Sequence, residues 1–347
     1  MVMADRPDVP TASPAIAAID LAGLGGQMVT ALVRVPFRRP WSGPAGVRHN
    51  LAQSVTREVV RSFMGYSSGL PIDEFRSVEG ALDSLCKVVL TPWVRAKGVE
   101  TSTEVVGGVP GIWYRPDDVE PIATILYLHG GGYVGTSPTM YAAFTAALAR
   151  TTQCEVFVAD YRLAPEFPFP AGVIDALAVA EALRSERPDR LLFLAGDSGG
   201  GGLAGSAVYF AEKSGHPPVA GLILFSPEAD LMLDQPSVTE NAPHDILPWN
   251  IPTAPYLHGE SATSREVSEI LADVSDWPPT FVAWGTDEMF RDAIRILVEH
   301  LEKAQVPTVA IEEAGMFHVF PILMPWAGAS RRVGAAVGDF VRRTVTR

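Results

Sequence analysis

The chain has 347 residues, of which 47% are hydrophobic and 19% are charged. This composition is typical of a globular protein with a sizeable core, and it excludes an intrinsically disordered chain. The 40 acidic and 27 basic residues give a formal charge of -13. A surface of that charge repels phosphate backbones, so we expect no nucleic-acid partner.

The chain contains only two cysteines, Cys86 and Cys154. Two cysteines are too few for a disulfide framework, and their separation does not match the paired spacing of a zinc site. We therefore expect a reducing, cytoplasmic setting and no metal. Residues 1–20 carry acids and prolines where a secretory signal would carry basic residues and an unbroken apolar core, so we expect no export signal.

One segment near the N-terminus, residues 16–37, is mostly apolar and nearly long enough to span a membrane. Asp20, Arg34 and three glycines interrupt it, which argues against stable membrane insertion and predicts a cap helix packed on the body of the protein. Contact with a membrane surface through residues 16–37 stays open, and so does a homodimer.

The predicted elements begin with an arm that ends at about Pro14. From residue 15 to about residue 97, apolar side chains recur at mixed spacings of three and four, which predicts a helical front section. Residues 103–116 then show short β-rich runs broken by Gly and Pro, a pattern typical of a hairpin.

Apolar runs follow, and helical stretches lie between most of them. The runs cover residues 123–129, 155–160, 190–196, 219–226, 280–285 and 308–314. Because these runs are apolar on both faces, they predict a largely parallel sheet covered by helices, an α/β fold. The connection 226–279 is far longer than an ordinary loop and predicts an inserted cap with helices of its own, above the C-terminal ends of the strands.

These patterns divide the chain into four segments. We predict an N-terminal arm and helical cap segment at 1–100, the first part of the α/β core at 101–229, a cap insertion at 230–276, and the second part of the core at 277–347.

Residues 196–200 read Gly-Asp-Ser-Gly-Gly, after an apolar run and before a helical one. That is the setting of a nucleophile elbow, in which the chain reverses sharply between strand and helix. Gly196 and Gly200 would remove side chains that clash across the turn, while Ser198 would take a strained conformation that presents its hydroxyl. A flexible glycine-rich loop is the alternative, and the position between strand and helix favours the nucleophile.

A second motif, His-Gly-Gly-Gly-Tyr at 129–133, directly follows an apolar run. Successive glycines let backbone N–H groups turn toward a ligand. Two such donors, together with the amide of Gly199, would surround a carbonyl oxygen that gains negative charge. A plain glycine turn is the alternative interpretation. We expect His129 to brace this loop by hydrogen bonding.

A serine hydroxyl needs a base, and the base needs an orienting carboxylate. His318 lies in the loop after the last predicted strand, and Asp287 lies in the loop after the strand 280–285. The order Ser198, Asp287, His318 is the one expected of this fold class. Glu288 and Asp292 stay open as alternatives for the acid. The other histidines fall in predicted caps, loops or a helix face, where a solvated or core position is expected: His49, His216, His244, His258 and His300.

Taken together, five stretches resemble the hormone-sensitive-lipase-like family of α/β-hydrolases, a bacterial group of carboxylesterases. They are HGGGY, DYRLAPEFPFPA at 160–171, GDSGG, GTDE and GMFHVF. The similarity extends from about residue 103 to the C-terminus, and the DYRLAPE run is its most specific part. The resemblance implies an α/β-hydrolase fold with an eight-stranded sheet, a helical cap, and an ester hydrolase without metal or cofactor.

Residue by residue, the resemblance implies a Ser-Asp-His triad and an oxyanion hole: Ser198, Asp287 and His318, with Gly131, Gly132 and Gly199 as oxyanion donors. It implies an architectural role for Asp160 and Arg162. The chain departs from the family pattern where Gly199 replaces an alanine, in a longer N-terminal section, and at Glu228 and residues 231–233, which would line the acyl pocket.

The sequence therefore predicts a serine carboxylesterase that acts on short- to medium-chain acyl esters through an acyl-enzyme intermediate. A lactonase or an amidase with the same triad is the alternative, because the triad itself does not distinguish them. A non-catalytic ligand receptor on the same scaffold is a third reading, which the retained His318 disfavours.

Overall fold

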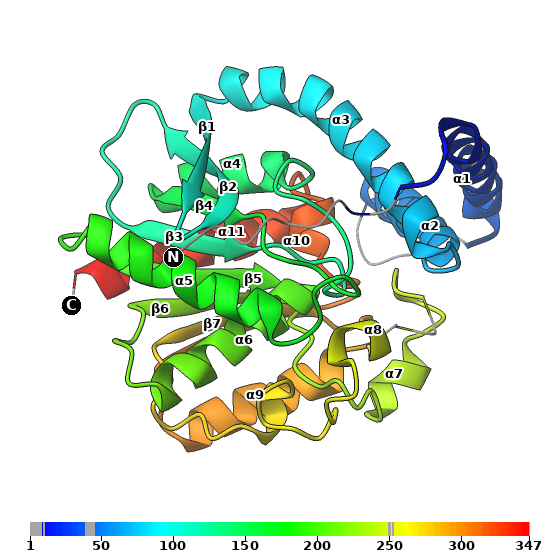
Figure 1. The fold of residues 1–347 in the computed structure, drawn as a ribbon. Coiled ribbons are helices and arrows are strands. Elements are labelled where there is room, and N and C mark those ends of the chain that lie inside the picture. The colour runs from blue at the N-terminus through cyan, green and yellow to red at the C-terminus, as the bar shows by residue number, and fades with distance from the viewer. Residues whose placement is uncertain (1–8, 10, 39–45, 249–250, 252, 347) are drawn as a thin grey trace.

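The computed structural model describes residues 9, 11–38, 46–248, 251 and 253–346. Its centre is an eight-stranded sheet in the order β1-β2-β4-β3-β5-β6-β7-β8 (Figure 1). The strands are β1 (Val99–Val106), β2 (Val109–Pro116), β3 (Thr124–Leu128), β4 (Glu155–Ala159), β5 (Leu192–Asp197), β6 (Gly221–Phe225), β7 (Thr280–Gly285) and β8 (Thr308–Glu313). β2 is antiparallel to β1 and β4, and the other neighbours are parallel. The predicted α/β fold is confirmed, and β1 and β2 form the hairpin predicted within residues 103–116.

Helices cover both faces of this sheet. One face carries α4 (Ala142–Thr152) and α11 (Gly328–Val345), and the other carries α5 (Ala171–Glu186), α6 (Ser198–Lys213) and α9 (Arg291–Lys303). Alternation along the strands assigns the faces, since successive side chains point to opposite sides. In β3, Ile125 and Tyr127 join the core under α4 and α11, whereas Leu126 and Leu128 join the core under α5, α6 and α9.

The N-terminal helices are α1 (Pro14–Arg34), the short η1 (Val35–Arg38), α2 (Val47–Ser67) and α3 (Ile72–Ala96). Polar contacts join α3 to the core, because Arg76 donates to both carboxylate oxygens of Glu166, at 2.9 and 2.7 Å, and to the carbonyl oxygen of Ala164 at 3.0 Å. Glu79 accepts a hydrogen bond from the backbone N–H of Thr136, just after the HGGG motif. The position of α3 is therefore tied to that motif.

The long connection after β6 contains short helices, as predicted: α7 (Pro236–Glu240), α8 (Ala254–Leu257) and η3 (Glu269–Leu271). A further short helix, α10 (Phe320–Leu323), follows β8. α2, α7 and α8 gather at one end of the molecule (Figure 1). Residues 249, 250 and 252 of the insertion, and 1–8, 10 and 39–45 of the front segment, lie outside the described residues. The division into four segments stays a prediction.

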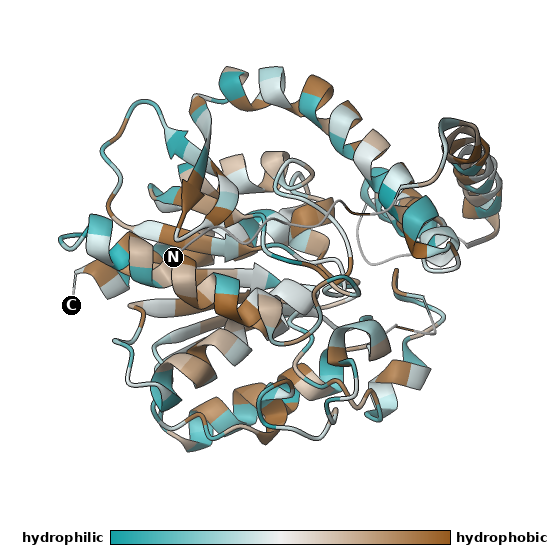
Figure 2. Cartoon of the chain, in the orientation of Figure 1, coloured by the Kyte–Doolittle hydropathy of each residue, from teal (hydrophilic) through white to brown (hydrophobic). Residues whose placement is uncertain are grey.

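Helix α1 presents an apolar surface to solvent (Figure 2). Ile19, Val29 and Val33 are each more than 60% exposed. Asp20, expected to interrupt the apolar segment, is 6% exposed and hydrogen-bonds with Tyr66 of α2. Pro14–Phe37 is thus long and apolar enough to cross a membrane by length and composition, a test that core helices and N-terminal signal sequences also pass.

Candidate active site

Ser198 stands at the turn from β5 into α6 with a backbone φ of 51°. This left-handed conformation is uncommon for a residue with a side chain, and it is the strained geometry expected of an elbow. A Cβ on Gly196 would lie 2.3 Å from the carbonyl oxygen of Gly200, and one on Gly200 would lie 2.2 Å from that of Leu128. The turn therefore requires glycine at both positions, as the sequence predicted.

His318 meets Ser198 as predicted. Its Nε2 atom lies 2.8 Å from the Ser198 Oγ atom, and both side chains are buried, at 1% and 7% exposure. Neighbouring loops hold the imidazole in place: the ring of Phe290, after β7, packs edge-on against it with 4.9 Å between ring centroids, and Ser226, after β6, accepts a hydrogen bond from the N–H of Val319 at 3.1 Å. The serine hydroxyl and the imidazole are therefore placed for proton transfer.

The prediction that Asp287 contacts His318 is wrong, because Glu288 occupies that place. The Glu288 Oε2 atom lies 2.9 Å from the His318 Nδ1 atom, and the Glu288 side chain is fully buried. Asp287 instead points toward α2, where its Oδ2 atom lies 3.5 Å from an Arg57 nitrogen and its side chain is 35% exposed.

The close approach of the loops after β7 and β8 explains which of the two neighbouring acids turns inward. A Cβ on Gly285 would lie 2.0 Å from the carbonyl oxygen of Met316, and the N–H of Asp287 donates to that same oxygen at 3.0 Å. The chain then curls so that Glu288 accepts a hydrogen bond from the N–H of Gly285 at 2.8 Å. The side chain of Glu288, and not that of Asp287, therefore points inward toward His318.

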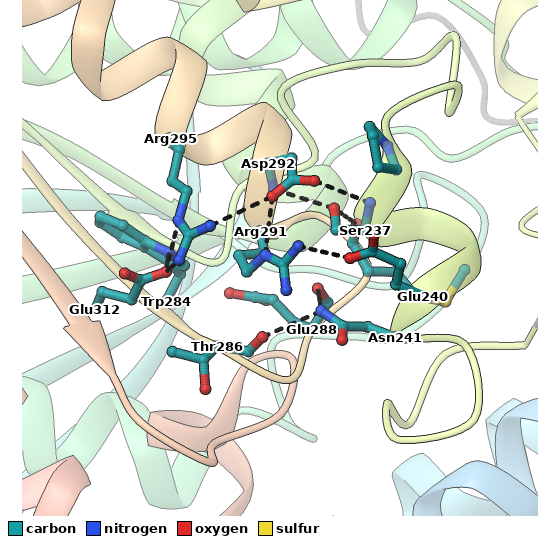
Figure 3. A network of polar contacts seen from close by, with 12 residues as sticks. Ser237, Glu240, Asn241, Trp284, Thr286, Glu288, Arg291, Asp292, Arg295 and Glu312 are labelled. Atoms are coloured by element: carbon teal, nitrogen blue, oxygen red, sulfur yellow. Dashed lines mark hydrogen bonds and ion pairs between the residues drawn. The ribbon is translucent and has the colours of Figure 1, made fainter.

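The other alternative for the acid, Asp292, lies in a separate polar network at the start of α9 (Figure 3). It accepts a hydrogen bond from the N–H of Ser237 at 3.0 Å and pairs with Arg291 at 2.8 Å. Asn241 donates to the carbonyl oxygens of Thr286 and Glu288, at 3.1 and 2.8 Å. This network fastens the loop that carries Glu288 to the cap insertion.

Burial shifts the pKa values of His318 and Glu288 in opposite directions. Desolvation lowers the pKa of His318, although the nearby carboxylates of Asp245 and Asp197 act to raise it. Desolvation raises the pKa of Glu288, while hydrogen bonds from Gly285 and Ser226 favour its carboxylate. A neutral imidazole is therefore favoured at rest, which is the state a general base needs.

The three glycines predicted as oxyanion donors lie on two segments that meet at the elbow. Gly131 and Gly132 have φ values of 117° and 60°, which favour glycine. A Cβ on Gly199 would lie 2.9 Å from the nitrogen of Tyr133 and 3.1 Å from the Cα of Gly132. The backbone of the glycine loop therefore lies so close to residue 199 that a side chain there would be crowded, which gives a reason for Gly199 where the family has alanine. The N–H of Gly199 belongs to the first turn of α6, which leaves it without an intrahelical acceptor.

Sequence reasoning missed Asp197, which joins the glycine loop to the elbow. Its buried carboxylate accepts hydrogen bonds from the N–H of Gly130 at 3.0 Å and from the hydroxyls of Tyr127 and Tyr141, each at 2.8 Å. Burial raises the pKa of Asp197 to about 6. Its place directly before the serine in GDSGG was the available signal, since that side chain must point inward from the end of β5.

The remaining architectural expectations concern His129 and Arg162. His129 braces the glycine loop as predicted, with its Nδ1 atom 2.8 Å from the Thr136 hydroxyl. Arg162 binds Asp175 of α5 through Nε and Nη2, at 3.0 and 2.8 Å. Glu228, in the predicted acyl-pocket wall, is buried and donates its N–H to the carbonyl oxygen of Ser198 at 3.0 Å.

Among the described residues, no group of three or more His, Cys, Asp or Glu side chains could hold a metal ion. The arrangement instead combines a serine on a strand-to-helix turn, a buried imidazole and a buried carboxylate above a mostly parallel sheet. Those are the parts of a serine hydrolase of the α/β class.

Comparisons with known proteins agree with this class. A family model described as the α/β-hydrolase fold matches residues 125–322. An acetyl-hydrolase from Streptomyces hygroscopicus is 34% identical over 245 residues, which are 68% of this chain and 81% of that protein. An esterase from Acinetobacter venetianus is 29% identical over 267 residues, 75% and 86% of the two chains.

Similarity to solved structures identifies a narrower family within the α/β-hydrolases. An esterase of the bacterial hormone-sensitive lipase family matches with a TM-score of 0.73 at 29% identity, over 84% of this chain and 98% of that one. The chain belongs to the α/β-hydrolases and, among them, to the hormone-sensitive-lipase-like esterases. Its relatives support ester hydrolase activity.

Proposed function

We propose that the protein is a serine carboxylesterase that cleaves short- to medium-chain acyl esters through an acyl-enzyme intermediate. The observation that carries this proposal is the continuous chain of contacts from Ser198 through His318 to Glu288, at 2.8 and 2.9 Å. In this proposal Glu288 takes the role that the sequence assigned to Asp287.

In the proposed reaction, His318 removes the proton from the Ser198 hydroxyl as its oxygen attacks the ester carbonyl. The negative charge on the tetrahedral oxygen is stabilised by N–H groups of Gly131, Gly132 and Gly199. Glu288 accepts a hydrogen bond from the Nδ1–H group of His318 and stabilises the imidazolium. His318 then protonates the departing alkoxide and next activates the water that releases the acid.

One observation supports a short or medium acyl chain. The relative from Streptomyces hygroscopicus carries the name acetyl-hydrolase. We keep the cytoplasm as the expected compartment, which is consistent with the unpaired state of Cys86 and Cys154.

The test uses purified protein and p-nitrophenyl esters from acetate to decanoate, with Ser198→Ala as the matched control. We expect hydrolysis that is fastest on the shorter chains and lost in the variant. A parallel series of an ester, a lactone and an anilide identifies the preferred bond. Labelling by a fluorophosphonate distinguishes an enzyme from a receptor, because a receptor with an unreactive serine stays unlabelled. Absence of both hydrolysis and labelling would overturn the proposal.

A further inference from the structure

Asp245 lies in the insertion between β6 and β7, and its side chain is fully buried. Its Oδ1 atom accepts hydrogen bonds from the N–H of His318 at 3.0 Å and from the N–H of Ile246 at 2.7 Å. Its Oδ2 atom accepts one from the N–H of Met289 at 2.7 Å. One carboxylate of the cap insertion therefore bridges the loop that carries His318 and the loop that carries Glu288.

The charge state of Asp245 follows from its partners. Among the described residues, the hydrogen bonds to the Asp245 side chain all come from backbone N–H donors. In a protonated carboxyl, the O–H group would itself be a donor and would face one of these donors without an acceptor. Burial raises the pKa of Asp245 and the neighbouring Glu288 acts in the same direction, while His318 and the hydrogen bonds from the N–H groups of Met289 and His318 oppose this rise. We therefore treat Asp245 as ionised when the site is at work.

The segment that carries Asp245 is also joined to the cap helix α2. The Arg61 Nη1 atom donates to the backbone oxygens of Ala242 and Asp245, at 2.6 and 2.7 Å. On the same face of α2, Arg57 interacts electrostatically with both Asp245 and Asp287. The place of the carboxylate is thus set jointly by the insertion and by the cap.

We infer that Asp245 is a positioning residue, which holds the His318 and Glu288 loops at their mutual spacing and stabilises the imidazolium that forms on His318. The inference rests on the proposed function, since it concerns the same reaction. Asp245 is hydrogen-bonded to the backbone of the His318 and Glu288 loops, so it acts through the position of that backbone and through its own charge.

The charged groups around His318 give the sign of the expected pH effect. Carboxylates face His318 from three elements, and they are Glu288 after β7, Asp197 at the end of β5 and Asp245 in the insertion. Arg57 of α2 interacts electrostatically with Asp245. The negative charge of Asp245 acts to raise the pKa of His318. Removing that charge lowers this pKa, so the acid side of the activity profile moves to lower pH.

The experiment compares kcat, KM and the pH profile of the parent protein with those of Asp245→Asn. The asparagine keeps one oxygen but turns an NH2 group toward a buried N–H donor. We expect a loss of about 10- to 100-fold in kcat, with KM changed by less than about threefold. We also expect the acid limb of kcat/KM at a lower pH than in the parent.

Asp292→Asn is the matched control, because Asp292 also ties the insertion to the Glu288 loop but is not among the groups that face His318. A variant that merely loosens the loops should lose stability and leave the acid limb in place. Asp245→Asn with parental kcat, or with an unmoved acid limb, would overturn the inference.

If Asp245→Asn does not fold, Asp245→Ser is measured in the same way, because its smaller side chain leaves space for a water molecule that accepts hydrogen bonds from the N–H groups. If neither variant folds while Asp292→Asn does, the carboxylate is a folding requirement and the inference fails. The pH dependence of fluorophosphonate labelling of Ser198 reports on His318 without an ester substrate. Failure of ester hydrolysis in the parent would therefore be distinguishable from failure of this inference.

Discussion

Around Ser198, buried carboxylates hold the reacting groups, whereas on helix α1 the carboxylate of Asp20 turns inward and apolar side chains face solvent. Asp197 and Glu288 each accept several directional hydrogen bonds. On α1, by contrast, apolar side chains such as Val29, which is 62% exposed, form no directional hydrogen bonds. A buried hydrogen bond fixes an atom within a few tenths of an ångström, so one substitution beside Ser198 should cost far more activity than several on α1.

The largest effect is expected at Glu288. Glu288→Gln removes the charge that stabilises the imidazolium, and we expect kcat to fall by about 10⁴-fold. Asp287→Asn is the matched control at the adjacent position, where the side chain is 35% exposed and we expect a change of about threefold or less. Steady-state kinetics on p-nitrophenyl butyrate measure both. A larger loss in the Asp287 variant would restore the sequence-based assignment.

A second pair of substitutions compares two neighbouring glycines of the oxyanion loop. Gly131→Ala would place a Cβ 2.2 Å from the carbonyl oxygen of Gly135 at a φ of 117°, so we expect a loss of about 10²- to 10³-fold in kcat. Gly132→Ala has open space and a φ of 60°, which costs about 1 kcal/mol, so we expect a loss below about tenfold. Equal losses in the two variants would show that the loop rearranges.

The pH profile of the parent protein tests the buried environment of His318. The base must be neutral, and activity falls as pH drops through its pKa because the imidazole takes up a proton. Burial lowers that pKa from the ordinary value of 6.5, so we expect the acid limb of kcat/KM to lie below pH 6.5. An acid limb at or above that pH would mean that the carboxylates outweigh desolvation.

The smallest effect is expected on α1. The combined variant Ile19→Ser, Val29→Ser and Val33→Ser changes exposed side chains, so we expect kcat/KM on a water-soluble short ester within about twofold of the parent. Each change should alter the free energy of unfolding by about 0.5 kcal/mol or less, as measured by denaturant titration. A large loss of activity would show that α1 contributes to the site.

Sequence alone was sufficient where the chemistry is local. Gly196 and Gly200 flank Ser198 within one turn, so the elbow could be predicted from the short-range sterics of the backbone. The sheet could also be predicted, since the strands after the hairpin coincide with short apolar runs such as residues 123–129. His318 followed from its place after the last strand, because the C-terminal ends of parallel strands share one edge.

Only the tertiary structure decided which of two adjacent acids contacts His318. Asp287 and Glu288 are one residue apart, and which of them points inward depends on how the loops after β7 and β8 pack at Gly285. The contacts of Asp197 and Asp245 were also decided by the tertiary structure, although the place of Asp197 directly before the serine was a local signal that its side chain points inward. Most of their hydrogen-bond donors, such as Gly130 for Asp197 and His318 for Asp245, lie far away in the chain, and no local pattern records a contact that exists only after distant segments have packed.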